Sequence, residues 1–101
     1  MNYEARLNQA MIANEIPQYM HGGITRYVMH GIAPGGFLSA VVENDLCGAL
    51  GRADDTNRSI IWNYVNLFYN DAPSECWGSP DMVNNWIKSG GVNGTDKVAV
   101  A

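Results

Sequence analysis

The middle of the chain, residues 34–70, carries apolar side chains three or four positions apart. This spacing places apolar residues on one face of a helix, and the strict alternation that a half-buried strand needs is absent. The first run of apolar residues comprises Phe37, Leu38, Val41, Val42, Leu46, Ala49 and Leu50, and the second comprises Ile60, Ile61, Tyr64, Val65 and Phe68. We therefore expect two helices here, each burying one face.

The junction between the two runs reads Gly-Arg-Ala-Asp-Asp at residues 51–55. A glycine can end one helix and an aspartate can cap the next, so this junction predicts a helical hairpin. The apolar phase nearly continues through the junction, which leaves one long kinked helix as the alternative. In either case the chain is predicted to be all-α.

Two shorter helices are predicted before this central pair. Residues 3–13 can form an amphipathic helix, and Pro17 fits the first turn of a second helix, where its missing N–H is not needed. The inner face of the second helix would carry Tyr19 or Met20, Ile24, Tyr27 and Val28. Gly22 and Gly23 each weaken a helix by roughly 1 kcal/mol relative to alanine, which predicts a frayed first turn. Close approach of another backbone or of a ligand is the alternative interpretation.

The last helix is predicted to start at Ser79, with a proline at its first position and an acidic residue facing the positive end of the helix dipole. Its apolar face comprises Val83, Trp86 and Ile87, and the glycines at positions 90 and 91 stop it. The pattern as a whole predicts a single helical domain over residues 1–91, followed by a C-terminal tail at residues 92–101. The domain should be a small bundle of about four to five helices around the central pair.

The composition adds a prediction about assembly and excludes two classes of partner. Charged residues make up 16% of the 101 residues, against roughly 25% in a typical soluble domain, so some surface is expected to be covered by a second copy or by a partner. A second copy is the simpler explanation, because most soluble oligomers are homo-oligomers. The formal net charge is −4, and an acidic chain with two lysines lacks the basic surface of a nucleic-acid binder. The same charge does not suit an anionic membrane surface. We therefore predict a homo-oligomer that binds neither nucleic acid nor a membrane.

The location of the protein is predicted from its N-terminal segment, its apolar runs and its cysteines. The N-terminal segment contains acidic residues and is amphipathic, so it does not resemble a signal peptide, and no apolar run approaches the ~20 residues of a membrane helix. Cys47 and Cys76 are the only cysteines, too few for a disulfide framework. Cys47 falls among small apolar residues and is expected to be buried. These observations predict a cytoplasmic protein.

Several polar residues stand on or beside the apolar helix faces and are the candidates for chemistry. Asp45 and Asn57 share the helical spacing of their apolar neighbours, and Arg26 flanks Tyr27. A buried carboxylate needs a partner, and Arg26, Arg52 and Arg58 are available to Asp45, Asp54 or Asp55. One interpretation is a structural polar network that fixes helix register. The other is a pocket for a small anionic ligand, with guanidinium groups on phosphate and aromatic side chains, such as Tyr64, on a base. The candidate ligand-binding residues are Arg26, Tyr27, Asp45, Arg52, Asp54, Asn57, Arg58 and Trp62.

Other chemistries have weaker support in the sequence. Residues 34–37 (Pro-Gly-Gly-Phe) could offer backbone N–H groups to an anion, but no P-loop lysine is present. Asp45 and Asp54 could act as an acid/base pair of a hydrolase, yet no nucleophile or histidine completes such a site, so we predict no enzyme and no catalytic residue. His21 and His30 are nine residues apart and lack zinc-ligand spacing, so no metal or cofactor is predicted.

Two tryptophans are candidates for a protein interface. Trp77 lies in an irregular loop and could cover the helix that begins at Ser79, and Trp86 lies on that helix. Tryptophan is enriched at interface hot spots, so an exposed face around both residues could bind a partner.

The chain resembles a family of short tailed-phage and prophage proteins over roughly residues 16–89. The blocks that carry the resemblance are Ile16-Pro17, Arg26-Tyr27, Pro34-Gly35-Gly36-Phe37-Leu38, Asn44-Asp45-Leu46, Ala53-Asp54 with Asn57, Tyr69-Asn70 with Pro73, Trp77-Gly78-Ser79, and Trp86. The family supplies no catalytic residue. Membership implies a small accessory protein made in an infected bacterium, and such proteins often counter host defence.

The resemblance and the residues together give two functional expectations. The first is a phage accessory protein that sequesters a nucleotide immune signal, for example a cyclic nucleotide, with arginines on phosphate and Tyr27 or Trp62 on a base. The second is an interaction module that inhibits a host protein or takes part in a phage assembly through Trp77 and Trp86.

Overall fold

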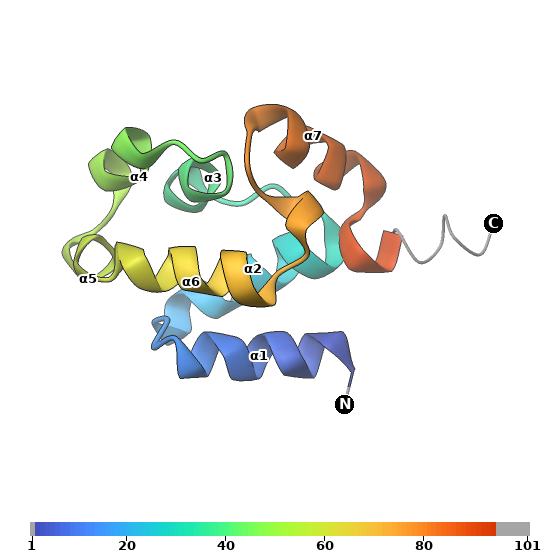
Figure 1. Cartoon of the computed structure of the whole chain (residues 1–101), viewed down its shortest axis with the longest axis horizontal. Helices are drawn as coiled ribbons and strands as arrows, with labels where there is room; N and C mark the ends of the chain where they lie inside the picture. Colours follow the sequence, from blue (N-terminus) through green and yellow to red (C-terminus); the bar gives the residue numbers. More distant parts are fainter. Residues whose placement is uncertain (1, 95–101) are drawn as a thin grey trace.

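The computed structural model describes residues 2–94, and in this range the protein is helical without a strand (Figure 1). The all-α prediction is confirmed, but the helices are shorter and more numerous than expected. They are α1 (Tyr3–Ala13), α2 (Gln18–His30), α3 (Gly36–Val42), α4 (Leu46–Arg52), α5 (Asp55–Ser59), α6 (Ile61–Asp71), the 3₁₀ helix η1 (Ser74–Cys76) and α7 (Pro80–Ser89). Of the predicted tail, residues 92–94 are helical, and residues 95–101 lie outside the described range.

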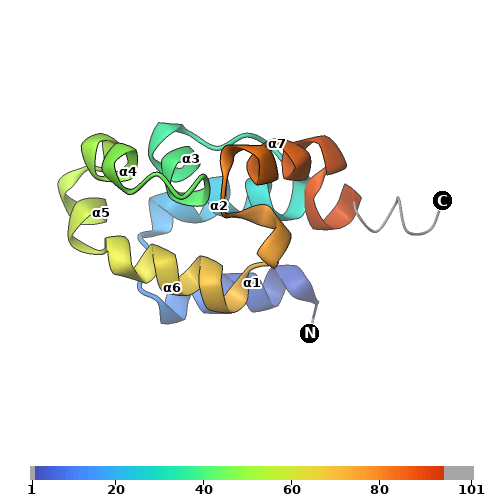
Figure 2. The ribbon, with the colours of Figure 1, turned by 45° about the horizontal axis from the view of Figure 1, so that its top comes forward.

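The helices pack in pairs around one core. Helices α1 and α6 lie side by side, α2 packs against α1, and α3 packs against both α4 and α6 (Figures 1 and 2). Helix α7 and η1 lie at the end of the molecule next to the last described residues (Figure 2). No helix within residues 2–94 is long and apolar enough to span a membrane.

The central pair of helices is divided further than the apolar pattern predicts, so both the single hairpin and the single kinked helix are wrong. Asn44 has a left-handed backbone (φ +65°) that ends the first segment, and the Asp45 side chain accepts a hydrogen bond from Gly48 N (2.9 Å) to start α4. Asparagine tolerates this conformation and aspartate is a strong N-cap, so local turn chemistry overrides the apolar phase. A second break at Ile60 separates α5 from α6.

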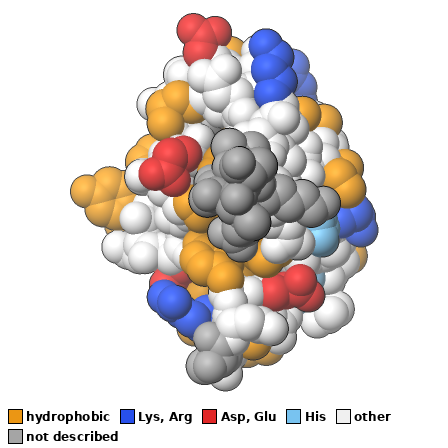
Figure 3. Space-filling model, turned by 90° about the vertical axis from the view of Figure 1, so that its right-hand side faces the viewer, with side chains coloured by type: hydrophobic (Ala, Val, Ile, Leu, Met, Phe, Trp, Pro, Cys, Tyr) orange, Lys and Arg blue, Asp and Glu red, His pale blue; other side chains and the backbone are white. Residues whose placement is uncertain are grey.

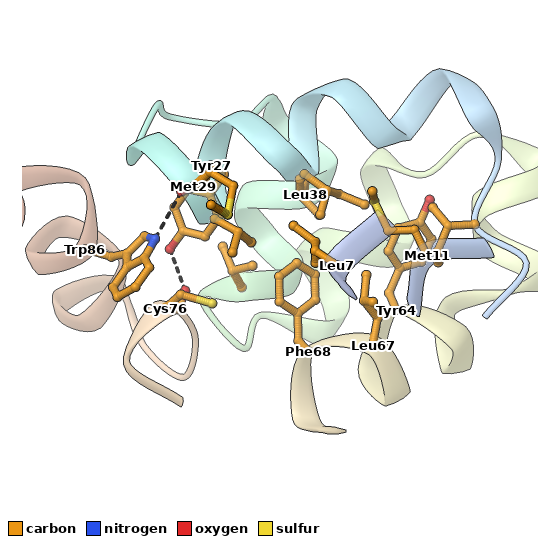
Figure 4. Packing of buried hydrophobic residues seen from close by; sticks show 14 of the residues in the cluster. Leu7, Met11, Tyr27, Met29, Leu38, Tyr64, Leu67, Phe68, Cys76 and Trp86 are labelled. Carbon is orange, nitrogen blue, oxygen red and sulfur yellow. Dashed lines mark hydrogen bonds between the residues drawn. The ribbon is translucent and has the colours of Figure 1, made fainter. Parts of the chain in front are cut away.

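The core is formed by side chains from α1, α2, α3, α6, η1 and α7 (Figure 4). Tyr27 is fully buried, and its hydroxyl donates a hydrogen bond to the carbonyl of Cys76 (2.5 Å). The Trp86 indole N–H donates to the carbonyl of Tyr27 (3.0 Å). These two bonds connect η1 and α7 to α2. Trp86 is 6% exposed and belongs to the core, so its predicted role in an interface is wrong.

The ends of α2 and α7 meet at two glycines. Gly31 caps α2 with φ +66°, and a Cβ atom placed on it would lie 2.8 Å from Gly91 N. A Cβ atom on Gly91 would lie 2.6 Å from Gly31 N. Such distances are too short for any side chain, so this backbone contact requires glycine at both positions.

The ends of several helices agree with the sequence prediction, with one exception in α2. Helix α1 spans the predicted residues 3–13, and Ser79 caps α7 through its hydroxyl (3.2 Å to Met82 N). The frayed first turn predicted at Gly22 and Gly23 is wrong, because both residues lie inside α2. The Arg26 guanidinium lies over Gly22, where a Cβ atom would be 3.0 Å from Nη1. The absent side chain therefore makes room for Arg26.

Candidate functional site

Two of the predicted ligand-binding residues are buried in the core. Tyr27 is 0% exposed and Asn57 is 3% exposed. The Tyr64 hydroxyl donates to Asn57 Oδ1 (2.6 Å), and Tyr64 is itself fully buried. Burial raises the pKa of both tyrosines above the usual value, which keeps them neutral donors. All three side chains therefore hold the fold: Tyr27 and Tyr64 are too buried to stack on a base, and Asn57 is too buried for the predicted hydrogen bond to a ligand.

Both candidate acidic residues cap helices, which confirms the helix cap predicted in residues 51–55 and differs from the buried position expected for Asp45. Asp45 and Asp54 are both exposed, and Asp54 Oδ1 accepts a hydrogen bond from Asn57 N (2.7 Å) at the start of α5. The other oxygen of Asp54 accepts a bond from the Tyr19 hydroxyl (2.5 Å). That bond and the backbone bond lower the pKa of Asp54, so its carboxylate is ionised at neutral pH. The expectation that Asp45 interrupts a buried face is therefore wrong.

Arg58 has the acidic partner that the sequence predicts. Its guanidinium forms an exposed ion pair with Asp55 (3.1 Å) and donates to the carbonyl of Ala53 (3.2 Å). An exposed pair of this kind contributes about 0–1 kcal/mol to stability, so its main effect is to occupy the guanidinium. Arg58 is thus the least available of the three candidate arginines.

An open groove lies between α2 and the start of α3, and it contains one of the predicted arginines. Its volume is about 270 Å³, and its lining comprises Tyr19, Met20, Gly23, Arg26, Gly35, Gly36, Phe37 and Leu38. Leu38 is buried, Met20 and Phe37 are half-buried, and Tyr19 and Arg26 are exposed. The groove therefore has an apolar floor with a guanidinium at its rim.

A second predicted arginine, Arg52 of α4, lies next to the groove without lining it. A Cβ atom placed on Gly36 would lie 3.2 Å from Arg52 Cδ, so Arg52 extends past the start of α3. Within residues 2–94, neither the Arg26 nor the Arg52 guanidinium makes a hydrogen bond or an ion pair. A Cβ atom placed on Gly48 would touch both Asp45 Oδ2 and Arg52 Nη1, so the Arg52 guanidinium lies beside the Asp45 carboxylate. The open groove therefore has the exposed Arg26 guanidinium at its rim and the Arg52 side chain next to it at Gly36. We call this arrangement the arginine groove, defined by Arg26, Arg52, Phe37 and the residues that line it.

The other predicted ligand residue, Trp62, is not part of the arginine groove. It lies in the first turn of α6 and is 69% exposed. Val65 and Tyr69 follow it at helical spacing and are 46% and 71% exposed, and Leu46 of α4 is 62% exposed. Leu46 and Val65 line one small cavity, while Val65 and Tyr69 line another. We call Leu46, Trp62, Val65 and Tyr69 the α6 surface.

Sequence reasoning missed the α6 surface because it placed Leu46 and Val65 on inner faces. The spacing of Trp62, Val65 and Tyr69 (i, i+3, i+7) was the available signal, since it marks a second apolar stripe on α6. Trp77 lies beside the end of this stripe, with its ring 5.9 Å from the Tyr69 ring. It is half-buried, and its ring contact is with α6.

The cysteines and histidines form no reactive or metal-binding cluster. Cys47 is exposed, contrary to expectation, whereas Cys76 is buried, and both are free thiols. Burial raises the pKa of Cys76 to about 12, so this thiol is inert at neutral pH. His21 is buried and its Nε2 lies 2.8 Å from the carbonyl of Ile16. In the part of the chain that the structure describes, no three His, Cys, Asp or Glu side chains are placed to hold a metal.

The face at the C-terminal end of the described chain shows no concentration of one charge. Basic and acidic side chains stand singly among hydrophobic ones there (Figure 3). This face therefore lacks the continuous basic patch that a nucleic-acid backbone requires.

Comparisons with known protein families, with curated proteins and with solved structures found no match.

Proposed function

We propose that the protein binds a compact anion that carries an apolar or aromatic group, and that it holds this ligand without converting it. The proposed site is the arginine groove. The observation that carries the proposal is the exposed Arg26 guanidinium at the rim of an apolar groove, with the Arg52 side chain next to the groove at Gly36 and no ion pair to either guanidinium within residues 2–94. The resemblance to phage accessory proteins suggests a nucleotide signal, sequestered in the cytoplasm of an infected cell.

The chemistry of the arginine groove suits a phosphate joined to a ring. A guanidinium group binds phosphate through two parallel hydrogen bonds, and a hydrogen bond to a charged group contributes about 1.5–3 kcal/mol. Phe37 and Met20 offer half-buried apolar surface to a base, and the exposed Tyr19 ring stands at the rim. Asp54 is bonded to Tyr19 at this rim, and Asp45 lies beside Arg52, so the two cations are opposed by two anions. The local charge is therefore close to balanced, although the whole chain is acidic.

The size of the groove favours a small ligand. Its volume of about 270 Å³ lies just below the ~300 Å³ at which typical ligand pockets begin. This volume suits one nucleotide unit. A cyclic dinucleotide or trinucleotide would therefore place a single unit in each groove.

The alternative, an interaction module built on Trp77 and Trp86, has less support. Trp86 is in the core and Trp77 is half-buried, so neither presents the open aromatic face on which that proposal depended. The apolar surface that the fold does expose lies on α6.

A thermal-shift panel tests the proposed function. The probes are adenosine and guanosine monophosphates, cyclic dinucleotides, cyclic ADP-ribose, inorganic phosphate and unphosphorylated adenosine. A ligand that binds the folded protein raises the melting temperature by mass action. We expect at least one phosphorylated probe to stabilise the protein more than phosphate or adenosine alone. No shift with any nucleotide at about 1 mM, where even a weak complex is half-formed, would contradict the proposal.

Matched arginine variants localise the effect. Arg26→Ala and Arg52→Ala should each weaken binding by roughly 10-fold to 100-fold, the loss expected for one charged hydrogen bond. Arg58→Ala removes the same charge from a guanidinium that Asp55 already occupies, and it should change affinity less than about 3-fold, as a screened surface charge does. An equal loss in all three variants would indicate general electrostatic attraction and would contradict the assignment of the groove.

A further inference from the structure

The α6 surface holds four of the eight large hydrophobic side chains that the fold leaves exposed within residues 2–94. Three of its members occupy one stripe of a single helix, and the fourth stands beside them on α4. From Ile61 to Asn70, helix α6 contains no charged residue, and its remaining outward positions are asparagines. Interface cores are depleted of charge and enriched in tyrosine and tryptophan, so this composition is that of a binding surface.

The area of the surface is sufficient for two copies to associate. The exposed fractions of Trp62 and Tyr69 are 69% and 71%, and those of Leu46 and Val65 are 62% and 46%. An aromatic side chain buries about 150–250 Å², so the four residues present roughly 500–600 Å². Two such surfaces facing each other would bury about 1,100 Å², just above the ~1,000 Å² at which specific interfaces begin.

The stripe is also complementary to itself. In an antiparallel pair of α6 helices centred between Val65 and Asn66, Trp62 of one copy faces Tyr69 of the other, and Val65 faces Asn66. The pairing repeats on both sides of a two-fold axis, which is the requirement of an isologous dimer. Residues 61–70 of the two helices carry no charge, so no like charges face each other along this segment. The acidic side chains next to it are Asp45, beside Leu46, and Asp71, at the end of α6.

We propose that a second copy of this chain covers the α6 surface, in a symmetric dimer whose α6 helices pack antiparallel across Trp62, Val65 and Tyr69. This inference does not depend on the arginine groove, which lies between α2 and α3 and shares no residue with the α6 surface.

Sedimentation velocity of the full chain over a concentration series tests the dimer. Each interface substitution acts twice in a symmetric dimer, so Trp62→Ala should raise the dissociation constant at least ~30-fold, as expected for a hot-spot residue. Ile12→Ala is the matched control, because Ile12 is 61% exposed on α1, outside the surface, and should leave the dissociation constant within about 2-fold. Circular dichroism of both variants confirms that they fold. A monomeric wild-type protein up to about 500 µM would overturn the proposal, since specific interfaces bind more tightly than this. A dimer that survives Trp62→Ala would overturn it as well.

Disulfide cross-linking tests the antiparallel arrangement separately. In a Cys47→Ser background, which removes the exposed thiol, Asn66→Cys places the two new thiols about 1.5 Å apart along the helix axis. Asn70→Cys places them about 13 Å apart along that axis, beyond disulfide reach. We expect a covalent dimer from Asn66→Cys under mild oxidation and none from Asn70→Cys. The reverse result would overturn the antiparallel packing.

Discussion

Replacing Tyr27 by phenylalanine tests how the two ends of the core are joined. The substitution removes only the hydroxyl that donates to the buried carbonyl of Cys76 (2.5 Å) and leaves the ring in place. The bond from Trp86 to the Tyr27 carbonyl also remains, because the backbone is unchanged. The loss is therefore confined to one hydrogen bond between α2 and η1.

The magnitude follows from what happens to the acceptor. A typical hydrogen bond contributes about 1 kcal/mol, and a buried polar group left without a partner costs about 1–3 kcal/mol. Cys76 is 0% exposed, so water does not readily replace the lost donor. We expect Tyr27→Phe to lower the free energy of unfolding by about 2 kcal/mol. For a domain of this size the melting temperature should then fall by roughly 8–16 °C.

Urea unfolding followed by circular dichroism measures this loss. Ile12→Ala is the control, because Ile12 is 61% exposed on α1 and lies outside both the core and the α6 surface. The control should stay within about 0.5 kcal/mol of the wild type, as surface substitutions do. If Tyr27→Phe also stays within that margin, the Tyr27–Cys76 bond does not hold η1 to α2 and the reasoning fails.

Two further predictions concern pH and backbone geometry. Burial is the main cause that raises the pKa of Cys76 and of Tyr3 to about 12, above the 9.0 and 10.0 of free groups. The unfolded chain therefore loses these protons at lower pH than the folded one, so stability is intact below pH 9 and declines as the pH rises toward 12. A urea midpoint that stays constant from pH 8 to 11 would contradict this. Gly31→Ala should destabilise by at least ~1–2 kcal/mol from its left-handed backbone alone, with the contact to Gly91 adding to the loss. Gly51→Ala, in α4 with open space around its Cβ position, should instead stabilise by up to ~1 kcal/mol. Thermal melts of the two variants should therefore shift in opposite directions, and shifts of the same sign would refute the glycine contact.

Helices with strong local signals could be predicted from the sequence. The N-cap serine and first-position proline locate the start of α7, and the apolar spacing of Ile24, Tyr27 and Val28 identifies the buried face of α2. The break at Asn44 was missed because it depends on a single left-handed residue within an unbroken apolar phase. Periodicity over a long window is insensitive to such a residue.

The candidate site could be predicted only in part. Arg26 and Arg52 were identified by residue type, but their placement beside one groove follows from the packing of α2, α3 and α4, which spacing along the chain does not specify. Tyr27 and Asn57 were assigned to a ligand because a buried aromatic and a buried amide have the same sequence pattern as a pocket lining. Their hydrogen bonds inside the core decide between the two roles.

Ligand binding in the arginine groove is the central claim, and an NMR titration tests it most directly. Adenosine monophosphate is added to ¹⁵N-labelled protein, and the backbone amide signals of Gly23, Gly35 and Gly36 are followed, since these glycines line the groove. We predict that these three signals shift together and saturate, and that Arg26→Ala moves saturation to a roughly 10-fold to 100-fold higher concentration. Unchanged glycine signals, or shifts confined to residues outside the groove, would contradict the account.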